Sequence, residues 1–97
     1  MITKTQRQYL KGVANNIKPL VKVGKMGLTD NILNSVDEVL TAHEIVKIDV
    51  LPQCEASASE LSIEIASETH SELVCQLGRK IVLYRKNPEK TSIVLPR

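Results

Sequence analysis

Apolar residues recur at helical spacing in three segments of the chain, which predicts helices over residues 4–17, 30–42 and 57–69. Pro19 ends the first pattern, because the residue before a proline avoids helical backbone angles. Thr29 stands where a side-chain oxygen would cap the second helix. Basic residues form a separate line beside the apolar stripe of the first helix: Lys4, Arg7, Lys11 and, if the helix reaches it, Lys18.

Other segments carry the patterns of strands. The clearest is "EIVKIDVL", residues 44–51, in which apolar residues alternate with charged ones. "LVKV", residues 20–23, is shorter, and "ELVCQLGRKIVLYR" reads as two strands with Gly78 at the turn between them. The tail contains one more short extended piece at residues 92–95.

Helices and strands therefore follow one another in the order α-β-α-β-α-β-β. Such alternation implies crossovers and some parallel pairing in the sheet. We expect an α/β fold arranged as a two-layer sandwich with a four-stranded mixed sheet. The length of 97 residues fits a single domain over residues 1–97. Its core must be aliphatic, because Phe and Trp are absent.

The composition, 42% hydrophobic and 25% charged residues, is typical of a globular protein. No run approaches the roughly 18 apolar residues of a membrane span. The N-terminal "MITKTQRQYLKG" lacks the apolar core of a signal peptide. We therefore expect a cytoplasmic monomer without a membrane partner.

The sequence offers no set of catalytic residues. It contains no nucleophile elbow, zinc-ligand set or Walker-type loop. His43 and His70 fall at the ends of predicted helices, which explains them better than catalysis does. Cys54 and Cys75 lack CxxC spacing, so we predict reduced structural thiols, with a disulfide or a shared metal site as alternatives. We expect no catalytic residue, no bound metal and no cofactor.

Charge is unevenly distributed along the chain, although the net charge is only +2. Residues 1–28 carry six basic residues and no acid, whereas residues 29–78 carry ten acids and one lysine. Residues 79–97 carry six basic residues and one acid. If the two ends fold together, the molecule has a basic face and an acidic face, and a basic face is typical of proteins that bind polyanions. The alternative is that opposite charges neighbour each other across the fold.

The loop "GKMG", residues 24–27, combines flexible backbone with charge. Glycine lacks the Cβ atom that would keep another backbone at a distance, and Lys22 and Lys25 supply positive charge. The loop leads into a helix N-terminus, whose amides favour phosphate. A GxxG loop clamps the nucleic-acid backbone in KH modules, although many ordinary turns share this spacing.

Only Tyr9 and Tyr84 are aromatic. This scarcity argues against recognition of bases stacked across an aromatic sheet. We therefore expect contacts to the backbone and shape of a structured RNA, with Tyr84 in the protein core.

Two long stretches resemble a known family. "IKPLVKVGKMGLTDNILNSVDEVLTAHEIVKIDVL" and "LGRKIVLYRKNPEKTSIVLPR" are similar to the CRM domain, specifically to single-domain bacterial YhbY-like proteins. The most specific parts are the "VGKMGLT" loop, the "HEIVKI" junction and the closing "VLYR…LPR" segment. The resemblance implies an RNA-binding α/β domain related in fold to the C-terminal domain of bacterial translation initiation factor 3. It also implies association with precursors of the large ribosomal subunit and a role in their assembly.

The resemblance extends to individual residues. The family's GxxG loop falls on residues 24–27, and its conspicuous basic residues fall on Lys22, Lys47, Arg85 and Lys86. Family members often have glycine where this chain has His70, and histidine adopts the left-handed conformation more easily than a branched residue.

We therefore expect a non-catalytic protein that binds rRNA in 50S precursors and assists ribosome assembly. The first helix and the GKMG loop are expected to lie side by side in one continuous basic surface. The expected RNA contacts are Lys4, Arg7, Lys11, Lys18, Lys22, Gly24, Lys25, Met26, Gly27, Thr29, Lys47, Arg85 and Lys86. The alternative is a protein-interaction module of the translation machinery, whose acidic helices would bind a basic ribosomal protein.

Overall fold

The computed structural model describes residues 2–87, 89, 93 and 95 of the chain. Its elements follow the predicted order. The helices are α1 (Lys4–Ala14), α2 (Asp30–His43) and α3 (Ala58–Thr69). The strands are β1 (Val21–Val23), β2 (Ile45–Val50), β3 (Glu72–Leu77) and β4 (Lys80–Tyr84). Two residues of the extended piece expected at residues 92–95, 92 and 94, lie outside the described residues.

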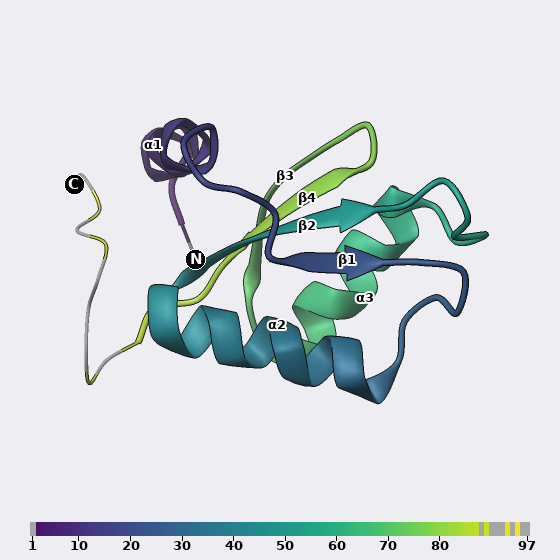
Figure 1. The fold of residues 1–97 in the computed structure, drawn as a ribbon. Helices are drawn as coiled ribbons and strands as arrows, with labels where there is room; N and C mark the ends of the chain where they lie inside the picture. The colour runs from purple at the N-terminus through teal and green to yellow at the C-terminus, as the bar shows by residue number, and fades with distance from the viewer. Residues whose placement is uncertain (1, 88, 90–92, 94, 96–97) are drawn as a thin grey trace.

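The four strands form one mixed sheet in the order β1-β2-β4-β3, which confirms the predicted sheet. β1 runs parallel to β2, and β4 lies antiparallel to both β2 and β3. Figure 1 shows α2 and α3 beneath the sheet and α1 above it. The sheet, α2 and α3 make the two expected layers, and α1 adds a third on the opposite face, called here the α1 face.

Alternating side chains of the central strands supply two separate cores. Ile48 and Leu83 belong to the larger core, which α2 and α3 cover. Ile45, Val82 and Tyr84 point the other way and pack against Leu10 and Ala14 of α1, among others. Burial raises the pKa of the Tyr84 hydroxyl, and the carboxylates of Glu44 and Glu72 raise it further. The α1 face therefore has an apolar core where α1 covers it.

The helix ends follow local capping chemistry. Thr3 and Gln6 form a reciprocal capping box at the start of α1, and the Thr29 hydroxyl accepts from the Ile32 amide as predicted. α1 ends at Ala14, three residues before the predicted end, because the chain tightens into a turn in which the Ile17 amide donates to the Ala14 carbonyl at 3.2 Å.

The other predicted local features are confirmed. His43 is the last residue of α2, and His70 closes α3 in the left-handed conformation with φ of 54°. Gly78 turns the β3–β4 hairpin with φ of 60°. Cys54 and Cys75 are both free thiols, which removes the disulfide alternative.

Arg7 ties α1 to the edge of the sheet. β3 is an edge strand, and its pairing with β4 shifts register between Leu73 and Cys75. The Arg7 guanidinium donates to the carbonyls of Leu73 and Val74 at this irregularity, the second at 2.9 Å. These bonds satisfy carbonyl groups at the bulge and fix α1 across the sheet.

Replacing Arg7 should therefore destabilise the protein. We expect Arg7→Ala to lower the free energy of unfolding by about 1–2 kcal/mol, because hydrogen bonds from a charged donor are lost. Lys4→Ala removes the same charge from an exposed position of the same helix, so we expect a change within about 0.5 kcal/mol. Urea denaturation measures both, and equal losses would contradict the role given to Arg7.

Candidate nucleic-acid interface

The GKMG segment forms a tight turn between β1 and α2. The Gly27 amide donates to the Gly24 carbonyl at 3.0 Å, which closes the turn. Gly27 has φ of 70°, a conformation that favours glycine. Lys25 and Met26 stand at the tip, and Met26 is 84% exposed. The turn therefore offers one charge and one apolar side chain to a partner.

The two glycines of the turn are not equivalent. A Cβ atom at Gly24 would meet only Leu51 Cδ1, at 3.7 Å, which is an ordinary van der Waals contact. A Cβ atom at Gly27 would have open space, but its backbone angle would be strained. Gly27 is thus required by the fold, whereas Gly24 is free to serve close approach by another molecule.

Side chains of the protein itself already interact with the N-terminus of α2. Thr29 caps it, and Asp30 places a carboxylate in the first turn. That carboxylate already complements the helix dipole and repels a phosphate at the same position. Thr29 therefore shapes the end of the turn, and Lys22 and Lys25 are the groups nearest in sequence that can attract an anion.

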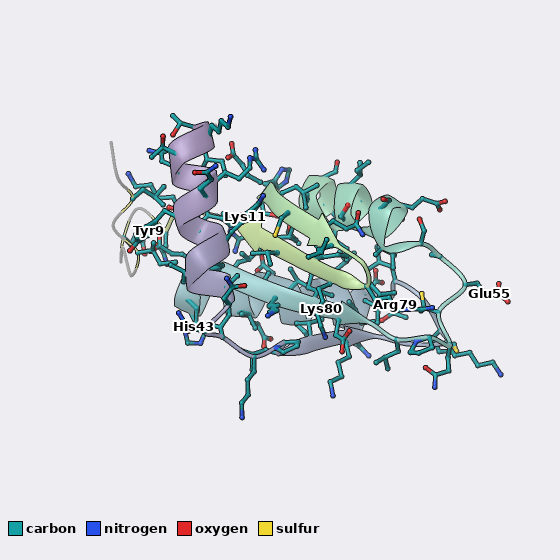
Figure 2. All side chains as sticks on the ribbon, turned by 90° about the horizontal axis from the view of Figure 1, so that it is seen from above. Tyr9, Lys11, His43, Glu55, Arg79 and Lys80 are labelled. Carbon is teal, nitrogen blue, oxygen red and sulfur yellow. The ribbon has the colours of Figure 1, made fainter. Side chains whose placement is uncertain are left out.

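Three lysines lie on the α1 face of the sheet. Val21 and Val23 of β1 point into the larger core, so Lys22 between them points to the α1 face. Lys47 and Lys80 occupy the corresponding alternate positions of β2 and β4. Lys80 pairs with Asp49 at 3.2 Å, and Lys47 Nζ donates to the Ala14 carbonyl at 3.2 Å. Figure 2 looks down on this face and shows Lys11 on α1 and Lys80 farther along the sheet, toward Arg79.

The expectation that the first helix and the GKMG loop lie side by side is wrong. Figure 1 places α1 over one end of the sheet and the loop between β1 and α2 at the other. The reason is that β1 follows α1 and carries the chain away from it. The two features can still face one partner, because the α1 face with Lys22, Lys47 and Lys80 lies between them.

Three predicted contact residues make internal bonds instead of pointing freely into solvent: Arg7, Arg85 and Lys47, whose Nζ donates to the Ala14 carbonyl. Arg7 holds α1 on β3, and the Arg85 guanidinium joins α2 to the end of α3. Arg85 donates to the Asp37 carboxylate at 2.7 Å, to the Thr69 carbonyl at 2.7 Å and to the Thr41 hydroxyl at 3.0 Å. Both arginines thus use their guanidinium groups to stabilise the fold.

The other predicted lysines are exposed but scattered. Lys4 and Lys11 lie on α1, Lys18 on the connection to β1, and Lys86 just after β4. The sequence reasoning missed Arg79 and Lys80 at the β3–β4 hairpin, which are both exposed. The Arg79 guanidinium donates to the Leu51 carbonyl just after β2, at 3.4 Å. The "GRK" turn and the strand alternation could have indicated both residues.

Acidic side chains gather on the other side of the sheet. α2 and α3 expose carboxylates at Asp37, Glu38, Glu60, Glu64 and Glu68. With lysines on the α1 face, this arrangement confirms the predicted basic and acidic faces, with Asp49 as an acid on the basic side.

Comparison with known proteins places this surface in context. The model of the CRS1 / YhbY (CRM) domain family matches residues 2–85. The chain belongs to this CRM family. It is 34% identical to the "Probable RNA-binding protein YqeI" of Bacillus subtilis over 96 residues, which cover 99% of this chain and all of the relative.

Two further relatives agree with this assignment. An "RNA-binding protein" of Haemophilus influenzae is 33% identical over 99% of this chain and 96% of its own length. The solution structure of a hypothetical protein from Staphylococcus aureus matches with a TM-score of 0.82 and 36% identity, over 99% of this chain and all of that one. The similarity to initiation factor 3 stays a prediction.

Among the described residues, no group of three or more His, Cys, Asp or Glu side chains could hold a metal ion. The same part of the chain contains no helix long and apolar enough to cross a membrane.

The two glycines of this CRM turn should respond differently to alanine. We expect Gly27→Ala to lower the free energy of unfolding by about 1–2 kcal/mol, because alanine is strained in the left-handed conformation. Gly24→Ala should change it by less than about 0.5 kcal/mol. Thermal and urea unfolding measure the difference, and a larger loss for Gly24→Ala would refute this account of the turn.

Proposed function

We propose that this CRM protein binds rRNA in precursors of the large (50S) ribosomal subunit in the cytoplasm and assists their assembly without catalysing a reaction. The observation that carries the proposal is the exposed Lys25–Met26 turn, which projects from the end of a sheet whose neighbouring face carries lysines. The relatives named as RNA-binding proteins support RNA as the partner. The choice of rRNA rests on the resemblance to YhbY-like proteins.

Binding would depend mainly on phosphate charge. Lys22 and Lys25 would contact phosphates next to the turn, and Gly24 would let the RNA backbone approach closely. Each phosphate that a lysine neutralises releases condensed counterions, which gives the affinity a steep salt dependence. Arg7 and Arg85 would act indirectly, by holding the helices that shape the surface.

A second candidate function rests on the acidic side. α2 and α3 expose carboxylates, and α3 also exposes Ile63, an apolar side chain that is 68% exposed and lies between Glu60 and Glu64 in the sequence. A basic ribosomal protein would complement this surface, and the protein would then act as an interaction module. Partners that remain bound in a nuclease-treated lysate would favour this function, whereas partners lost with the RNA favour direct RNA binding.

Removing the charge at the tip of the turn should weaken RNA binding in a salt-dependent way. We expect Lys25→Ala to reduce affinity for large-subunit precursor rRNA and to flatten the log–log salt slope by about 0.7–0.9, the value of one phosphate contact. Fluorescence anisotropy at several salt concentrations measures both quantities.

Met26→Ala provides the matched control, because it changes the neighbouring exposed position without changing charge. Its salt slope should equal that of the unmodified protein. An unchanged affinity and slope after Lys25→Ala would rule out phosphate binding at the turn.

A further inference from the structure

A groove of about 390 Å³ lies between α1 and the part of the sheet that α1 leaves uncovered. Three lysines from three different elements line it: Lys11 of α1, Lys47 of β2 and Lys80 of β4. None of the described residues that line the groove is acidic. Lys80 is half-exposed and forms an ion pair with Asp49, which does not itself line the groove. Lys47 donates a hydrogen bond to the Ala14 carbonyl at the C-terminus of α1.

Like charges gathered around a concave surface repel one another and raise the local positive potential. Lys11 is exposed on α1, so the fold does not require a positive charge at this position. The groove is therefore preorganised for an anion, and Lys47 contributes charge from a fixed position.

The rest of the lining is largely apolar. Ala14, Cys75, Leu77 and Val82 contribute to it, and Leu77 is 81% exposed. An exposed leucine beside lysines offers a surface for a flat, uncharged ring. Asn15, also in the lining, carries an amide that can hydrogen-bond to a base edge. A ligand that suits the groove has an anionic part and a flat heteroaromatic part, as a nucleotide does.

We propose that this groove binds one unpaired nucleotide of a single-stranded RNA segment. Lys11 and Lys80 contact its flanking phosphates, and the exposed Leu77 packs against its base. The volume falls within the range of pockets that hold small ligands, roughly 300–1,000 Å³. Only an unpaired nucleotide can enter, because bases in an RNA helix are stacked and hidden.

The inference rests on the proposed RNA binding but concerns a site separate from the GKMG turn. Lys22 lies on the sheet face between the two, so one strand of RNA can contact both. The GKMG turn would then contact the RNA backbone, and the groove would contact one base of the same strand.

Cys75 provides a natural reporter of the groove. It lines the groove and is partly exposed, whereas Cys54 is buried elsewhere. The full chain is treated with N-ethylmaleimide with or without saturating 20-nucleotide random-sequence single-stranded RNA. Mass spectrometry then follows alkylation of each cysteine. We expect the RNA to slow alkylation of Cys75 at least about threefold, whereas a duplex of equal length that also binds should not.

Variants separate the groove from the turn. Lys11→Gln, Lys80→Gln and Leu77→Ser should each reduce the protection of Cys75 at saturating RNA, and all three change exposed side chains. Lys4→Gln removes a charge from the same helix outside the groove and should keep the protection. Lys25→Ala should weaken affinity but also keep the protection once RNA saturates the protein.

Each result of this experiment bears on the proposal. If anisotropy shows RNA binding while Cys75 alkylation is unchanged, the groove is not a nucleotide site and the proposed function stands. Equal protection by duplex RNA would overturn the assignment to an unpaired nucleotide. If neither RNA binds, the groove proposal fails, and binding of large-subunit precursor rRNA by anisotropy tests the proposed function separately.

Discussion

The position of α1 across one end of the sheet determines which surface this protein can present. Two cations hold the helix there: Arg7 binds the irregular edge of β3, and Lys47 binds the last helical carbonyl. An 11-residue helix is only about 16 Å long, and it cannot cover a whole face of a four-stranded sheet. The part that α1 leaves uncovered carries lysines together with the exposed Leu77.

The same geometry explains how charge is sorted. The middle of the sequence forms α2 and α3, whose outer sides carry the carboxylates. The two basic ends supply α1, β1 and β4, which meet at the opposite face. Separation of charge along the chain thus becomes separation of charge between two sides of the molecule. A polyanion approaching the acidic side is repelled, so the fold orients the encounter as well as attracting it.

Features that depend on neighbours in sequence could be predicted. The Thr29 cap, the alternation of β2 and the Gly78 turn each follow from local backbone chemistry. The face on which α1 packs could not, since its apolar stripe fits either side of a sheet. Its distance from the GKMG loop follows from that packing and from the direction of β1.

The structural roles of Arg7 and Arg85 could not be predicted from the sequence either. Arg7 bonds to residues 66 and 67 positions away, and Arg85 bonds to Asp37 across 48 positions. A basic residue in sequence looks the same whether its guanidinium meets carbonyls of its own chain or phosphates of another. The exposed Lys22 and Lys25 were accessible to sequence reasoning, because strand alternation and loop position indicated their exposure.

We propose that this basic side binds rRNA of the large subunit during assembly. The most direct measurement is ultraviolet crosslinking in cells, purification of the protein and sequencing of the attached RNA. We expect strong enrichment of large-subunit rRNA, including precursor sequences that mature ribosomes lack, and loss of that enrichment when Lys22 and Lys25 are both replaced by alanine. Crosslinks spread over cellular RNA in proportion to abundance, or unaffected by the double replacement, would contradict it.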